Sequence, residues 1–105
     1  MPALEPRDSA AFRRDPAGAY QAGENWVYFS FDPTLFGYAL WGQPAAEDVR
    51  ALCALMELEL DRAPHVALVY LRDLTFVSPD AFQVLADYTV KNEAALRSII
   101  THTAI

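Results

Sequence analysis

Aromatic and β-branched residues gather in two short runs near the start of the apolar part of the chain. Trp26 to Phe31 is the first run, and Leu35 to Trp41 is the second. Both compositions are typical of strands, and Asp32-Pro33-Thr34 between them is a turn sequence. The pattern predicts an antiparallel hairpin, in which Gly37 marks a bulge or a close approach of another group.

Two later segments have the apolar spacing of helices. The segment from Ala45 to Arg62 is followed by Ala63-Pro64, which ends it. Its apolar face contains Val49, Leu52, Cys53, Met56 and Leu60. A second helix is predicted to begin at Pro79, with Ser78 as its N-cap, and to stop near Arg97. Its inner face contains Ala81, Phe82, Leu85, Tyr88 and Leu96.

Two further runs predict strands on either side of the second helix. The continuous apolar run Val66 to Leu71 is typical of a central strand, and Ser98 to Ile105 is β-branched. The element order is therefore β-β-α-β-α-β. We expect an α/β fold with a mixed, mainly parallel four-stranded sheet and helices on one face. The strand 98–105 is expected at an edge, free to pair with a second copy in a homodimer or larger species.

The first 24 residues have no sustained period. They contain three prolines, two glycines and mixed charge. This composition predicts a flexible N-terminal arm over residues 1–24, followed by one α/β domain over residues 25–105.

Charge and cysteine content exclude several classes of protein. The net charge is −6 and the eight basic residues are scattered, so the chain lacks the basic patch that direct nucleic-acid binding needs. Cys53 is the single cysteine, which fits a reducing, cytoplasmic location. No membrane-spanning run and no signal peptide are expected.

A polar corner separates the third predicted strand from the second helix. The candidate residues for a switch corner at the helix start, where a protein partner would bind, are Asp73, Thr75, Ser78 and Asp80. Asp73 and Asp80 could form an acid–base pair or hold a metal ion, but we interpret them as a turn former and a helix starter, since no His, Lys or Cys accompanies them. Ser78 is interpreted as an N-cap rather than a nucleophile or phosphate acceptor. We therefore predict no catalytic residue, no metal site and no cofactor.

The hairpin holds more aromatic side chains than one layer of helices can bury. Alternation along the first strand places Trp26, Tyr28 and Ser30 on one face and Val27, Phe29 and Phe31 on the other. Core packing with ordinary surface aromatics is one interpretation. The other is an exposed patch for self-association or a ligand, with Trp26, Tyr28, Tyr38 and Trp41 as the candidates.

The segment Leu68 to Leu85, LVYLRDLTFVSPDAFQVL, resembles the signature of the STAS domain, the fold of bacterial anti-sigma-factor antagonists. In that family a buried strand leads through a Thr-Phe-hydrophobic step to Asp-Ser-Ser-Gly-Leu at a helix start. Thr75-Phe76-Val77 matches the first part, and the resemblance covers roughly residues 26–105. Pro79 stands where the family has its phosphorylated serine, and the expected fold is a truncated version. The resemblance implies a regulatory, non-enzymatic domain that responds to a protein partner.

The segment 30–52, SFDPTLFGYALWGQPAAEDVRAL, followed by the STAS-like part, is similar to N-terminal regions of AraC-type bacterial transcription regulators. This similarity implies a sensing or protein-interaction domain from such a regulator. The alternative function is a module that binds a small apolar ligand with its aromatic hairpin.

Overall fold

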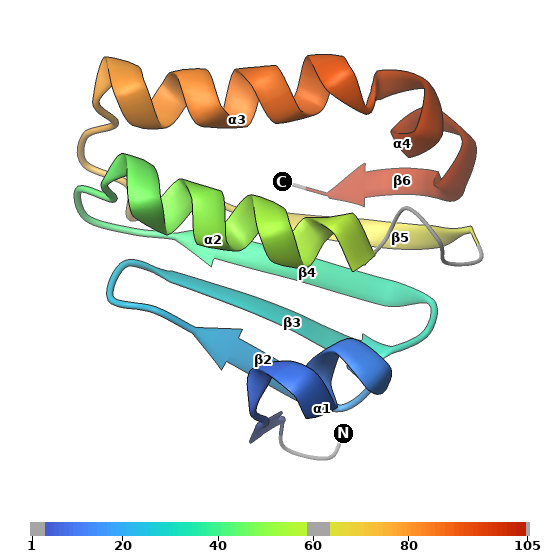
Figure 1. Ribbon diagram of the computed structural model, residues 1–105. Coiled ribbons are helices and arrows are strands. Elements are labelled where there is room, and N and C mark those ends of the chain that lie inside the picture. The colour runs from blue at the N-terminus through green and yellow to red at the C-terminus, as the bar shows by residue number, and fades with distance from the viewer. Residues whose placement is uncertain (1–3, 59–63, 105) are drawn as a thin grey trace.

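Strands and helices alternate along the chain and build one mixed sheet with helices packed on it (Figure 1). The computed structural model describes residues 4–58 and 64–104. Its strands are β1 (Glu5–Pro6), β2 (Ala19–Ala22), β3 (Trp26–Asp32), β4 (Leu35–Leu40), β5 (His65–Tyr70) and β6 (Ile100–Ala104). Its helices are α1 (Ser9–Arg14), α2 (Ala46–Met56), α3 (Pro79–Lys91) and α4 (Glu93–Ile99).

The strands lie in the sheet in their order along the chain, from β1 to β6. β2, β3 and β4 form an antiparallel meander, whereas β1 pairs parallel to β2, and β4, β5 and β6 pair parallel to one another. The α/β class and the predicted hairpin 26–41 are confirmed. The sheet has six described strands where four were predicted, because residues 4–24 add β1 and β2, and it is mixed, with three parallel and two antiparallel pairings.

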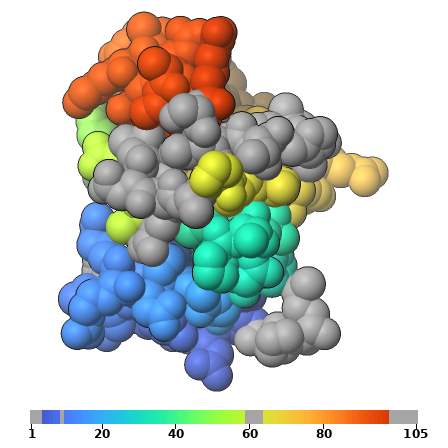
Figure 2. All heavy atoms as spheres, turned by 90° about the vertical axis from the view of Figure 1, so that its right-hand side faces the viewer, coloured from blue at the N-terminus to red at the C-terminus, as the bar shows by residue number. Residues whose placement is uncertain are grey.

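One face of the sheet carries the main core. Trp26, Tyr28, Phe36 and Leu40 of β3 and β4 pack there against Leu52 and Leu55 of α2 and Phe12 of α1. α1 and α2 lie on the same side of the strands (Figure 1). Figure 2 shows this layering from the side, with α2 (lime) at the left and atoms of β4 (teal) and β5 (yellow) further right. We call this side the covered face.

α3 packs beside α2 in the helix layer. Ala81 and Tyr88 of α3 form a second buried cluster with Val49 and Cys53 of α2. Ser78 caps α3 and Pro79 occupies its first turn, as predicted. α2 therefore has two neighbours, the sheet and α3, which explains why its apolar stripe is wide.

Residues 4–24 of the predicted flexible arm are part of the fold. Asp8 caps α1 by accepting a hydrogen bond from the Ala11 amide at 3.0 Å. The helix buries Phe12 completely, with its ring edge-on to that of Tyr28 at a centroid distance of 6.0 Å. Residues 4–24 contain two strands and a helix where an arm without regular structure was predicted. The sequence did not indicate this helix because it owes its stability to one tertiary anchor, which no local periodicity reveals.

The second predicted helix is divided. α3 stops at Lys91, where Asn92 leaves helical geometry and its side-chain amide donates to the Tyr88 carbonyl at 3.0 Å. α4 then continues to Ile99, so the last strand begins at Ile100 and lies at the end of the sheet order, as expected for an edge. The predicted end of the first helix near Arg62 lies outside the described residues.

Replacing Phe12 with alanine tests whether the N-terminal segment belongs to the core. The Phe12→Ala variant is expected to lower the free energy of unfolding by about 3–5 kcal/mol, because it empties a fully buried site. Phe76→Ala is the control, since Phe76 is 56% exposed and its loss is expected to cost less than about 1 kcal/mol. Urea denaturation of both variants gives the comparison, and equal, small effects would restore the flexible-arm prediction.

Candidate functional site

The corner between β5 and α3 uses its polar side chains to hold the backbone. The Ser78 hydroxyl accepts a hydrogen bond from the Ala81 amide at 3.2 Å, which confirms the N-cap interpretation. The Thr75 hydroxyl donates to the Gly42 carbonyl at 2.9 Å, and the Gly42 amide donates to the Asp73 carbonyl at 3.0 Å. The loop after β5 is thus fastened to the end of β4, where Gly42 has a φ of 65°.

The two candidate carboxylates of this corner are exposed. The Tyr70 hydroxyl donates to Asp73 at 3.2 Å, and partial desolvation, together with Asp73, raises the pKa of Tyr70. Asp80 lies in the first turn of α3, where its charge complements the helix dipole. Within the described residues, no group of three or more His, Cys, Asp or Glu side chains is placed to hold a metal ion.

The four aromatic candidates do not form an exposed patch. Trp26 and Tyr28 are buried in the core, and Tyr38 packs against the same core. Trp41 is half-buried just beyond β4. The predicted alternation is confirmed, but it is the opposite set of residues, including Phe29 and Phe31, that lies away from the helices.

The strand register defines this second side, which we call the open face. Residues that pair across neighbouring strands project to the same side of a sheet. Val27 pairs with Ala39, which pairs with Tyr70, and Leu35 pairs with Val66. The described open face consists of Tyr20, Ala22, Val27, Phe29, Phe31, Leu35, Gly37, Ala39, Val66, Leu68 and Tyr70. Asp32 pairs with Leu35 across the bulge at the end of β3, so its carboxylate lies at the rim of this face. No other charged side chain of β2 to β5 occurs on it, and no helix of the described residues packs on it.

A close approach shapes the centre of the open face. A Cβ atom on Gly37 would lie 2.5 Å from the ring of Phe29 and 2.7 Å from the Leu68 carbonyl oxygen. Gly37 therefore leaves room for the Phe29 ring to lie across the strand, which confirms the close approach expected there. Phe29 also meets the Phe31 ring edge-on at 5.2 Å. Together these contacts make a continuous apolar surface from β3 to β5.

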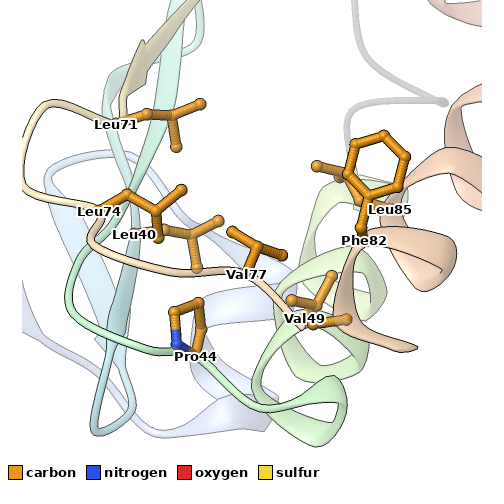
Figure 3. Close-up of a pocket in the computed structure, with 9 residues that line it drawn as sticks. Leu40, Pro44, Val49, Leu71, Leu74, Val77, Phe82 and Leu85 are labelled. Atoms are coloured by element: carbon orange, nitrogen blue, oxygen red, sulfur yellow. The ribbon is translucent and has the colours of Figure 1, made fainter. Parts of the chain in front are cut away.

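A cavity of about 250 Å³ lies between α3 and the ends of β4 and β5. Figure 3 shows its two sides, with Leu71, Leu74 and Leu40 facing Phe82 and Leu85 across the gap. Pro44, Val49, Val77 and Ala81 complete the lining. The lining is essentially apolar. The cavity forms because α3 packs on α2 and not directly on the sheet. The loop from Leu71 to Ser78, rather than a helix, covers the ends of β4 and β5.

Sequence reasoning identified the neighbourhood of this cavity but missed the cavity. It singled out the polar residues of the corner, which turn outward or bond to the backbone. A sequence feature that indicates the cavity lies in the same segment. Leu71, Leu74 and Val77 are apolar and recur at intervals of three through a stretch without helical structure. No residue of the aromatic hairpin except Leu40 contributes to the lining.

Two further side chains that could take part in chemistry, the Cys53 thiol and the His65 imidazole, are part of the core. Burial, followed by the charge of Glu57, raises the pKa of Cys53 to about 11, as expected for a small core hydrophobe. His65 is 2% exposed and its ring lies 4.9 Å from that of Phe36. β5 carries His65 into the covered side of the sheet.

Comparison of the chain with protein-family models, with curated proteins and with solved structures gave no match. The resemblance to STAS domains therefore stays a prediction that rests on the residues quoted for it. In residues 4–58 and 64–104, no helix has both the length and the apolar character needed to cross a bilayer.

The Ser78 cap can be removed without disturbing the core. Ser78→Ala is expected to lower the free energy of unfolding by about 1 kcal/mol, because the Ala81 amide loses its partner. Ser78→Asp is the control, since aspartate is an equally good cap and is expected to keep the stability. Urea unfolding measures both, and an alanine variant as stable as the wild type would contradict the capping role.

The raised pKa of Cys53 predicts slow chemical labelling of its thiol and a free energy of unfolding that falls at alkaline pH. At pH 8 a thiol with a pKa near 11 reacts about 200-fold more slowly than a free cysteine with a pKa of about 8.5, through ionisation alone. Because the unfolded chain ionises this thiol first, the free energy of unfolding falls as the pH rises from about 9 towards 11. Labelling at the same rate in native buffer and in urea would contradict burial of the thiol.

Proposed function

We propose that this chain is a non-catalytic protein-interaction module whose open face packs against the same face of a second copy. The observation that carries the proposal is the contrast between the two sides of the sheet. One side is covered by α1 and α2, and the other presents aromatic and aliphatic side chains without a described cover. Uncovered apolar surfaces of this kind mark interaction sites in soluble proteins.

The size of the open face suits a weak, specific dimer. Strands β2 to β5, which carry the described open face, span 23 residues, which at about 3.3 Å per residue and 4.8 Å per strand gives a projected area of about 360 Å². Two copies would cover about 720 Å² in projection and more in accessible area, at the lower end of specific interfaces. We therefore expect a concentration-dependent dimer rather than a permanent one.

The chemistry of the face favours an identical partner. Among β2 to β5 the only charged group on this surface is Asp32 at its rim, so a charged partner gains little there. Two flat apolar sheets can pack about 10 Å apart with their side chains interdigitated. A two-fold axis brings the same patch to both copies and leaves no unmatched surface. The net charge of −6 on each copy opposes association, so added salt is expected to strengthen the dimer.

A binding role agrees with the way the polar residues of the corner are used. The Ser78 hydroxyl is engaged as a cap, Thr75 anchors a loop, and Asp73 accepts from Tyr70. These are structural tasks, which supports a module that acts by association rather than by chemistry. The STAS-like segment supports the same conclusion, since that resemblance implies a regulatory domain of a bacterial regulator.

Replacing two alanines, one on the open face and one elsewhere, with lysine tests the proposed interface. Ala39 lies in the middle of the open face between Val27 and Tyr70, and Ala51 lies on the exposed side of α2. Ala39→Lys places a charge on the face without removing a contact, whereas Ala51→Lys adds the same charge elsewhere. Sedimentation velocity between about 10 and 500 µM is expected to show the wild type and Ala51→Lys dimerising, with Ala39→Lys at least tenfold weaker.

Two outcomes would contradict this interface. A wild-type monomer at the highest concentration would remove self-association. A dimer that survives Ala39→Lys but dissociates when residues 101–105 are deleted would place the contact at the β6 edge, where strand pairing between copies is the competing arrangement.

A further inference from the structure

We infer that the cavity between α3 and the ends of β4 and β5 is a binding site for a small, neutral, apolar molecule. Its nine lining residues are Leu40, Pro44, Val49, Leu71, Leu74, Val77, Ala81, Phe82 and Leu85. The site is separate from the open face and goes beyond the proposed self-association, which does not require the cavity to be filled.

The volume fixes the size of the ligand. A cavity of about 150 Å³ lined by aliphatic and aromatic side chains is known to hold benzene, so the 250 Å³ present here suits about ten non-hydrogen atoms. A bicyclic aromatic or a compact branched hydrocarbon has this size. A long-chain lipid does not fit into it.

The lining fixes the polarity of the ligand. Aliphatic side chains, a proline ring and the Phe82 ring surround the space, and none of them can pair with a buried charge or hydroxyl. Burying an unpaired polar group is unfavourable, so the molecule must be apolar wherever it contacts this lining. Any polar group it carries has to point out through the open side.

The surroundings disfavour an anionic ligand. Asp73 and Asp80 are exposed and stand next in sequence to the lining residues Leu74 and Ala81. The amide of Ala81, which would otherwise attract an anion to the helix start, is already bonded to Ser78. From Leu71 to Leu85 the charged residues are Arg72, Asp73 and Asp80, so this segment carries a net charge of −1 and does not attract a carboxylate or sulfonate.

The position and one exposed side chain support this assignment. α/β folds place ligands at the carboxyl ends of their parallel strands, and the cavity lies where β4 and β5 end. Phe82 lines the cavity and yet is 64% exposed. A bound molecule would bury part of this ring together with the facing leucines.

Naphthalene is a suitable probe because it is neutral and has about the inferred size. In the full chain, methyl-detected NMR is expected to show saturable shifts for Leu40, Leu74, Val77 and Leu85 as naphthalene is added, while the methyl groups of Val90, which is 75% exposed, stay unchanged. 1-Naphthalenesulfonate, with the same rings and a negative charge, is expected to bind at least tenfold more weakly.

Cavity-filling variants test the location. Ala81→Leu occupies the space from α3, and Ala51→Leu is the matched control on the exposed side of α2. Ala81→Leu is expected to weaken naphthalene binding at least tenfold, and Ala51→Leu to leave it within twofold. Because Ala81 is fully buried, Val77→Phe serves as a second filling variant from the loop side, with the same expected loss, should Ala81→Leu fail to fold.

Three results would overturn the inference. They are the absence of saturable shifts at the cavity methyl groups up to the solubility limit of naphthalene, equal binding in the wild type and in a folded filling variant, and equal affinity for the sulfonate. Sedimentation of the same samples reports the dimer separately, so a failure here is distinguishable from a failure of the proposed self-association.

Discussion

The described helices pack on one side of the sheet, although its strands carry apolar side chains on both sides. On the covered face, Tyr28, Phe36 and Leu40 complete a core with α1 and α2. On the open face, the rings of Phe29 and Phe31 contact each other, and Gly37 leaves room for the Phe29 ring over the neighbouring strand. This one-sided packing is the constraint on which the proposed interface depends, because hydrophobic free energy remains available there for a partner.

The same arrangement explains the cavity. α2 packs on the sheet through Leu52 and Leu55 and on α3 through Val49 and Cys53, so it stands between them. α3 is thereby held beside α2, and the ends of β4 and β5 are covered by the loop Leu71–Ser78 instead of by a helix. The hydroxyl groups of Thr75 and Ser78, two of the candidate residues of the polar corner, make the hydrogen bonds that keep this loop in place.

Local patterns predicted the elements whose residues carry their own signal. The hairpin 26–41 has aromatic and β-branched runs around a turn, and α3 has Ser78 and Pro79 at its start. The N-terminal segment could not be predicted, because α1 is six residues long and depends on Phe12 reaching Tyr28. Alternation separated Tyr28 from Phe29, but only the strand order and the position of α2 decide which of the two faces is covered.

Solvent accessibility of the open-face methyl groups tests the central claim most directly. A soluble paramagnetic probe broadens the NMR signals of methyl groups that reach solvent, and Val90, which is 75% exposed, provides the internal reference. We expect Val27, Leu35 and Leu68 to become protected as the protein concentration rises, while Val90 stays accessible. If these three residues are broadened to the same extent at every concentration, the open face has no partner and the account is wrong.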